Sequence, residues 1–297
     1  MYRANLISVP LLASLVMLAS LQLVHIYQPA YSHILSSDEN ASLLEMFHQI
    51  HVQAQLIQTI FPFNTKQAHE HAIYAAAILS TKNWTTVDAD RSIVSNVLLP
   101  SISTMEELTR TPNSSYSEIK GEVAALDNIL SGFTVTYIGD RVFRNSSIQA
   151  LIISELANDI SEKYGKAFGV VVNSSNMMMM MNMSSNSNDN SSMAGMTMMT
   201  NTHTKKVSTT NNSNTISDVI DYQTAQALTV DALEILNKDL KPVAPGNATQ
   251  ADAEVQTYLQ QLKDAIDNRA PLMDIMTIIH GHIHPLLIAT FKLQLKP

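Results

Sequence analysis

The 297-residue sequence contains no cysteine, which excludes disulfide bonds, thiolate metal sites, iron–sulfur clusters and a cysteine nucleophile. It has only eight glycines, and no two of them stand in a GxG or phosphate-loop arrangement, which argues against nucleotide binding. Basic residues are outnumbered, with 18 Lys and Arg against 26 Asp and Glu, and no basic run is longer than Lys205-Lys206. A nucleic-acid partner is therefore not expected.

The N-terminus has the pattern of an export signal. Arg3 precedes an uncharged apolar stretch from Ala4 to Val24, and Ala30 and Ser32 suit the small-residue positions of a signal-peptidase site. A stretch of about 20 apolar residues is also long enough to cross a bilayer. Residues 1–32 are therefore expected to be either a cleaved signal peptide or a membrane anchor. In both cases the protein is expected to be extracytoplasmic, secreted or anchored to the outer face of the cell membrane.

Acceptor triplets for N-glycosylation favour the same location. The pattern Asn-X-Ser/Thr predicts a glycoprotein that is modified at loops or helix starts. Triplets inside the Asn/Ser-rich stretch carry less weight, because that composition produces them frequently. The triplets begin at Asn40, Asn83, Asn113, Asn145, Asn173, Asn182, Asn190, Asn211 and Asn247.

Nearly all of the chain after residue 36 has the 3.6-residue apolar period of helices. We predict an all-α fold of about eight antiparallel helices, because the connectors are short. The strand-like run Phe133–Ile138 is too short and isolated for a sheet and is expected to be an extended connector. The predicted helices run from a Ser37/Asp38 cap to Pro62, then over Thr65–Ser80, Asp88–Leu108 with a kink at Pro100, Ser117–Leu130, Ser146–Phe168, Ile216–Asp239, Asp252–Asp267 and Pro271–Leu293.

These helices are expected to form one or two helical bundles. The two-bundle arrangement divides the chain into residues 36–132 and 133–297, and the alternative is a single packed domain, since no segment between them resembles a linker. Residues 173–215 consist mainly of Asn, Ser, Thr and Met without an apolar period, so they are expected to be a disordered insert in the second bundle.

The insert is rich in methionine: ten of the 16 methionines of the chain lie between residues 177 and 200. Thioethers are soft ligands that select Cu(I), and closely spaced ones can wrap round a single ion. The alternative is a low-complexity loop produced by repeat slippage, which five consecutive methionines favour. The candidate copper ligands are Met193, Met196, Met198, Met199 and the nearby His203.

Four histidines, His48, His51, His69 and His71, flank a predicted turn at residues 61–64. Folding the two helices back about this turn places His51 opposite residue 72, so His51 and His71 are expected to face each other. Glu45 and His48 form one Glu-x-x-His motif, whereas a ferritin-like dimetal site needs two such motifs and two further carboxylates. The four histidines are therefore either metal ligands or polar residues that bind neighbouring side chains.

A second group of histidines lies near the C-terminus. His280 and His284 are four residues apart on one predicted helix and share a face, which is a natural spacing for metal chelation. No glutamate lies between them and His282 points elsewhere, so a metalloprotease is not indicated. No GxSxG motif is present, and the protein is not expected to be an enzyme.

Three segments carry a family resemblance: Asp140–Arg144, Leu151–Gly169 and Val219–Leu228. They resemble the helical extracytoplasmic extension that precedes the membrane domain in some iron-permease-family proteins, and similar stand-alone exported archaeal proteins. Tyr164 and the run Asp221-Tyr222-Gln223 match the pattern of that extension, although Asp221 stands where the family has Glu and the Met-rich insert occupies the link. The resemblance implies a helical module linked to metal handling, with a membrane metal transporter as a partner, and does not imply permease activity.

Together these patterns predict an extracytoplasmic transition-metal-binding protein that acts as a carrier or buffer, with copper as the first metal and iron as the second. The alternative is a glycosylated cell-surface scaffold or interaction protein without metal, and a ferritin-like dimetal oxidase comes third. Imidazole ligands are expected to lose metal near pH 5 through proton competition, whereas thioether ligands keep it.

Overall fold

The computed structural model describes residues 37–81, 94–170 and 215–293, and every regular element in these ranges is a helix. The predicted all-α fold is therefore confirmed. The first helix, α2 (Ser37–Ile60), ends at the turn before α3 (Thr65–Thr81), as the Pro-Phe-Asn sequence predicted. The Met-rich tract and the N-terminal segment lie outside these ranges.

The remaining helices follow the predicted order with small shifts at their ends. Several of them continue into or begin as a π-helical turn, in which the backbone hydrogen bonds span five residues. Their bounds are η1 (Val94–Leu98), α5 (Leu99–Arg110), α6 (Tyr116–Phe133), η2 (Thr134–Ile138), α7 (Asp140–Phe143), α8 (Ser146–Ala167), α10 (Val219–Ile235), η3 (Leu236–Leu240), η4 (Gly246–Ala248), α11 (Thr249–Asp267), α12 (Leu272–Ile278), η5 (Ile279–Ile283) and α13 (His284–Phe291).

The prediction of an extended connector at Phe133–Ile138 was wrong. Phe133 is the last residue of α6, and η2 continues the helix until Gly139, whose φ of 81° favours glycine and stops it. The β-branched residues of this run lower helix propensity only slightly, and the Thr134 hydroxyl donates to the Leu130 carbonyl at 3.0 Å. Helix continuation therefore satisfies backbone groups that a lone extended segment would leave without partners.

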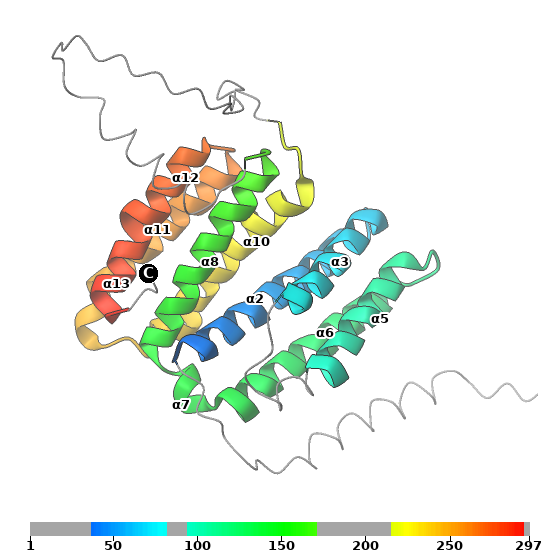
Figure 1. The fold of residues 1–297 in the computed structure, drawn as a ribbon, viewed down its shortest axis with the longest axis horizontal. Helices are drawn as coiled ribbons and strands as arrows, with labels where there is room; N and C mark the ends of the chain where they lie inside the picture. Colours follow the sequence, from blue (N-terminus) through cyan, green and yellow to red (C-terminus); the bar gives the residue numbers. More distant parts are fainter. Residues whose placement is uncertain (1–36, 82–93, 171–214, 294–297) are drawn as a thin grey trace, which may run out of the picture. The chain divides into compact units, whose positions relative to one another are not determined.

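Helix α2 is the central element of the packing. It contacts α3, α6, α8 and α10. Helices α8 and α10 also lie beside each other along their lengths (Figure 1). The contacts of α2 with α8 and α10 cross the boundary at residue 132 that the two-bundle arrangement would use. Residues 35–297 group as one compact unit, which fits the single-domain alternative.

Small side chains allow the closest of these contacts. Ala68, Ala72 and Ala75 of α3 have no exposed surface and lie at helical spacing, so α3 can pack tightly on α2. Large aliphatic side chains fill the space between the other helices, and each one that is removed from water contributes about 1.5–3 kcal/mol. Examples without any exposed surface are Ile50, Ile57, Ile102, Leu126, Ile153 and Leu259.

The acceptor triplets differ in exposure. Asn40 lies inside α2 and is only 6% exposed, so this acceptor is a poor site for a glycan in the folded protein. Asn113, Asn145 and Asn247 are exposed at loops or helix starts. The triplets at Asn83 and in the Met-rich insert lie outside the described residues.

One described run, Leu272–Phe291, is long and apolar enough to cross a membrane by length and composition alone. Core helices of soluble proteins meet the same criterion. This run packs against α8 and α11, and it contains the C-terminal histidines. Its composition therefore does not decide where it lies.

Candidate metal-binding histidines

His48 and His51 lie one turn apart on α2, and each has a carboxylate at the same ring nitrogen. His48 Nδ1 is 3.0 Å from Asp231 Oδ2 of α10, and His51 Nδ1 is 2.7 Å from Asp127 Oδ1 of α6. Gln55 supports the second pair, since its amide donates to Asp127 Oδ2 at 3.2 Å. Carboxylates at Nδ1 fix the orientation of each ring and leave Nε2 as the nitrogen for another ligand.

The carboxylates raise the pKa of both histidines. Burial, and to a smaller extent His51, lowers the pKa of His48, but the attraction of Asp231 at 3.0 Å and of Asp239 outweighs these effects. The hydrogen bond with Asp127 is the largest cause of the raised pKa of His51, and burial opposes it. Protons therefore compete with a metal at this pair more strongly than at free imidazole.

His69 and His71 of α3 have different surroundings. His69 Nδ1 is 3.1 Å from the Thr109 hydroxyl, and His71 has no exposed surface. The two ring nitrogens of His71 lie 2.7 Å and 3.0 Å from the side-chain amides of Gln53 and Gln223. The expectation that His51 and His71 face each other was wrong, because His51 bonds to α6 and His71 bonds to α2 and α10.

His280 and His284 are brought together as their spacing predicted. Their Nδ1 atoms are 3.2 Å apart and their rings meet edge to face, with centroids 4.9 Å apart. His284 Nε2 is 3.1 Å from the Ser154 carbonyl of α8, and buried His280 Nε2 has no hydrogen-bond partner among the described residues. His282 stacks on Tyr258 at 4.3 Å and does not join the pair.

Burial lowers the pKa of both members of this C-terminal pair. Burial alone lowers the pKa of His280. Burial and the neighbouring His280 lower the pKa of His284 to about 4, although the hydrogen bond to the Ser154 carbonyl raises it. His284 is therefore neutral at physiological pH and at pH 5, and the lowered pKa of His280 favours its neutral form as well. Neutral imidazole is the form that binds metals.

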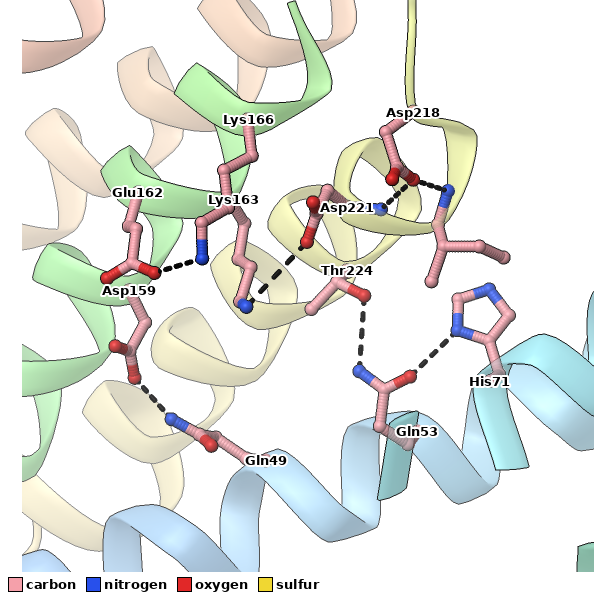
Figure 2. Close-up of polar contacts among 11 residues, drawn as sticks. Gln49, Gln53, His71, Asp159, Glu162, Lys163, Lys166, Asp218, Asp221 and Thr224 are labelled. Atoms are coloured by element: carbon pink, nitrogen blue, oxygen red, sulfur yellow. Dashed lines mark hydrogen bonds and ion pairs between the residues drawn. The ribbon is translucent and has the colours of Figure 1, made fainter. Parts of the chain in front are cut away.

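A partly buried polar layer between α2, α8 and α10 includes Gln49 and Asp159 (Figure 2), and Asp159 forms a carboxyl pair with Glu45 of α2. The Gln49 amide donates to both Glu45 and Asp159, which are also hydrogen-bonded to each other. Burial, followed by the repulsion of Glu45, raises the pKa of Asp159 to about 8. At neutral pH the pair of Glu45 and Asp159 therefore holds a proton. Further along this layer, Lys163 Nζ lies 3.7 Å from Asp221 Oδ1.

The Met-rich insert is attached where α8 ends and α10 begins. The Ser217 amide donates to the Ala167 carbonyl at 2.8 Å, and the Ser217 hydroxyl donates to the same carbonyl at 2.9 Å. The helices thus meet as predicted for an insert between them. Its candidate ligands Met193, Met196, Met198, Met199 and His203 lie outside the described residues.

The described residues contain no group of three or more His, Asp or Glu side chains that could hold a metal ion. Two histidine pairs remain, one supported by carboxylates and one without them. Sequence reasoning missed Asp127, Asp231 and Asp159, which lie far from their partners in the chain. The spacing of Glu45, Gln49 and Gln53 was a usable signal, since polar residues every fourth position in an apolar helix indicate a buried polar stripe.

The residues that carry the family resemblance also meet in the fold. The Tyr164 and Tyr222 rings lie 6.3 Å apart, and their hydroxyls donate to the Ala270 and Ile266 carbonyls. No protein-family model matches the chain, and neither a curated protein nor a solved structure matches it. The resemblance to the iron-permease extension therefore stays a prediction.

Proposed function

We propose that this protein is an extracytoplasmic carrier or buffer of transition metals, with copper as the first metal and iron as the second. The observation that carries the proposal is the His48–His51 pair, in which both Nδ1 atoms lie against carboxylates. Histidines that bind metals commonly donate the other ring N–H to a carboxylate or a backbone carbonyl. His284 follows the same pattern through the Ser154 carbonyl.

The number of ligands favours a carrier over a catalyst. At His48 and His51 the described chain offers two imidazoles, and the remaining coordination positions are left to water or to a ligand of a partner. A site of this kind exchanges its metal more readily than a closed four-ligand structural site. A membrane metal transporter is the partner that such an exchange suits.

Copper comes first because of the thioethers. The Met-rich insert supplies soft ligands at one end of the α8–α10 pair, and imidazole binds copper, iron and zinc alike. The apolar N-terminal stretch and the exposed acceptors Asn113, Asn145 and Asn247 support an extracytoplasmic location. There, thioethers resist the oxidation that inactivates thiol ligands.

The competing scaffold function has its own support. His69 and His71 are bound to Thr109 and to two glutamines, so these two histidines serve packing in the fold. A dimetal oxidase has less support, because Glu45 turns to Asp159 on α8 whereas His48 turns to Asp231 on α10. The Glu-x-x-His residues thus have separate partners.

A paired substitution tests the proposal. In the full-length protein, H48Q/H51Q should lose one Cu(II) or Zn(II) equivalent in a calorimetric titration at pH 7.5, because the side chain that replaces each imidazole is a poor ligand. H69Q is the matched control, since His69 contacts a hydroxyl and no carboxylate. Equal binding by the parent and by H48Q/H51Q would remove the support for this site.

A further inference from the structure

The C-terminal histidine pair differs from the α2 pair in its charge environment. His48 and His51 each contact a carboxylate, whereas no ion pair among the described residues involves His280 or His284. The neighbours of the C-terminal pair are the Ser154 carbonyl, which contacts His284, and the rest of an apolar helix, in which Ile279 and Ile283 are also buried. A cation bound by this pair would therefore have no neighbouring carboxylate to neutralise its charge.

Charge then selects among metals. The cost of moving an ion from water to a low-dielectric site rises with the square of its charge, so a divalent ion between two neutral ligands costs about four times as much as a monovalent one. Zn(II) and Cu(II) therefore suit the carboxylate-supported His48–His51 pair. The uncharged pair of His280 and His284 suits a monovalent ion.

The number and type of ligands lead to the same metal. Zn(II) takes three or four ligands, which water can complete at His48 and His51, whose side chains are 20% and 38% exposed. His284 is buried, and two soft or intermediate ligands satisfy Cu(I) without added water. The pair also lies at the π-helical turn η5, and such turns are frequent at functional sites. The chain offers this ion two ligands that are four residues apart and already in contact.

The hydrogen bonds identify the donor atoms. Because the Ser154 carbonyl only accepts, His284 holds its proton on Nε2 and presents a lone pair at Nδ1. His280 Nδ1, 3.2 Å away, donates to that lone pair when no metal is bound. Two bonds of about 2.0 Å to an ion would set the Nδ1 atoms up to about 4 Å apart, a small rotation from this contact.

We propose that His280 and His284 form a Cu(I) site in which both Nδ1 atoms bind the ion and Zn(II) is rejected. This inference rests on the proposed metal-binding function and names the oxidation state and the ligand atoms of a second site. On binding, His280 loses its Nδ1 proton and gains one at Nε2, the buried atom without a partner among the described residues. The pair thus binds the ion without net proton release.

The first test is a competition titration against a chromophoric Cu(I) chelator without oxygen. It uses the full-length protein with Met193, Met196, Met198 and Met199 changed to Leu together with H203Q and H48Q/H51Q, so that the other proposed ligands are removed. This background should bind one Cu(I) and no Zn(II) at the same site. Adding H280Q or H284Q should weaken Cu(I) binding at least about 100-fold, whereas the control H282Q in the same turn should not.

A second measurement does not depend on the folding of variants. In protein labelled with ¹⁵N-histidine, one equivalent of Cu(I) should shift the Nδ1 resonances of His280 and His284 and leave both Nε2 atoms protonated. Shifts confined to His280 Nε2 would overturn the proposed ligand set. Loss of all Cu(I) binding in the background variant, while the parent still binds metal, would also overturn the His280–His284 site. In that case the proposed function would stand. A parent that binds neither copper nor zinc would overturn both.

Discussion

Substitution of Asp159 by Asn should stabilise the protein more at pH 8 than at pH 5. The Asp159 carboxyl is hydrogen-bonded with Glu45 through a proton and through the Gln49 amide. Its pKa is raised from 3.8 to about 8 in the folded state, mainly by burial and by repulsion from Glu45. Asparagine keeps a neutral donor for Glu45 at every pH, so it removes this titration.

The direction in which the free energy of unfolding changes with pH follows from proton linkage. Between pH 4 and pH 8 the folded chain holds a proton that the unfolded chain has lost, so the free energy of unfolding falls as the pH rises through this window. The contribution is complete below about pH 4 and is lost above the folded pKa. The full slope is about 1.4 kcal/mol per pH unit, so about 4 kcal/mol over three units is the upper bound of the effect.

Urea denaturation of the parent and D159N at pH 5, 6, 7 and 8 measures the difference directly. D264N is the control, since Asp264 is exposed and its carboxylate accepts a hydrogen bond from Gln260 on the same helix. A D159N difference that stays constant from pH 5 to pH 8 would show that Asp159 and Glu45 do not hold a proton between them.

Removing the carboxylates behind the α2 histidines should weaken metal binding without removing a ligand. D127N and D231N should each lower the affinity of the His48–His51 pair for Cu(II) about 10–100-fold, the usual effect of losing the group that orients a metal-binding imidazole. The loss of negative charge acts in the same direction, because a divalent ion between neutral ligands is less well compensated.

The pH dependence separates this effect from loss of folding. The carboxylates raise the pKa of His48 and His51, so D127N and D231N should also shift the pH at which metal is lost to lower values. D140N serves as the control, because exposed Asp140 pairs with Arg144, the residue that follows the same short helix. Unchanged affinity in D127N and D231N would indicate that the metal, if bound, does not use His48 and His51.

The lowered pKa of the C-terminal pair changes one expectation from the sequence. Imidazole sites were expected to lose metal near pH 5, which would separate them from thioethers by acid alone. The raised pKa values of His48 and His51 keep this expectation for the α2 pair, but the pKa of His284 is about 4, and the pKa of His280 is lowered as well. Acid therefore separates His48 and His51 from the other candidate ligands, and substitutions must separate His280 and His284 from the methionines.

Helix positions were predictable because apolar periodicity is a local property of the sequence. The pairing of His280 with His284 was equally predictable, since a spacing of four residues on one helix fixes their proximity. The contacts of His51 and His71 could not be predicted in this way. The turn sets which residues of the two helices lie at the same height, but not how each helix is rotated about its axis. Their actual partners, Asp127 and Gln223, come from helices far along the chain.

The continuation of α6 through Thr134–Ile138 shows a second limit of the sequence. Strand propensity in five residues is worth less than the hydrogen bonds that helix continuation provides, so the local composition misled the prediction. The raised pKa of Asp159 could not be predicted either, because it depends on burial between the helices and on Glu45, which lies on another helix.

Elemental analysis of the full-length protein purified from its native membrane or medium is the most direct measurement of metal handling. The proposed function predicts at least one copper per chain, with iron second, and a lower copper content when H280Q, H284Q and the Met-to-Leu changes are combined. Protein that is folded by circular dichroism but carries no transition metal above trace, before and after exposure to Cu(I), would contradict it and favour the glycosylated scaffold.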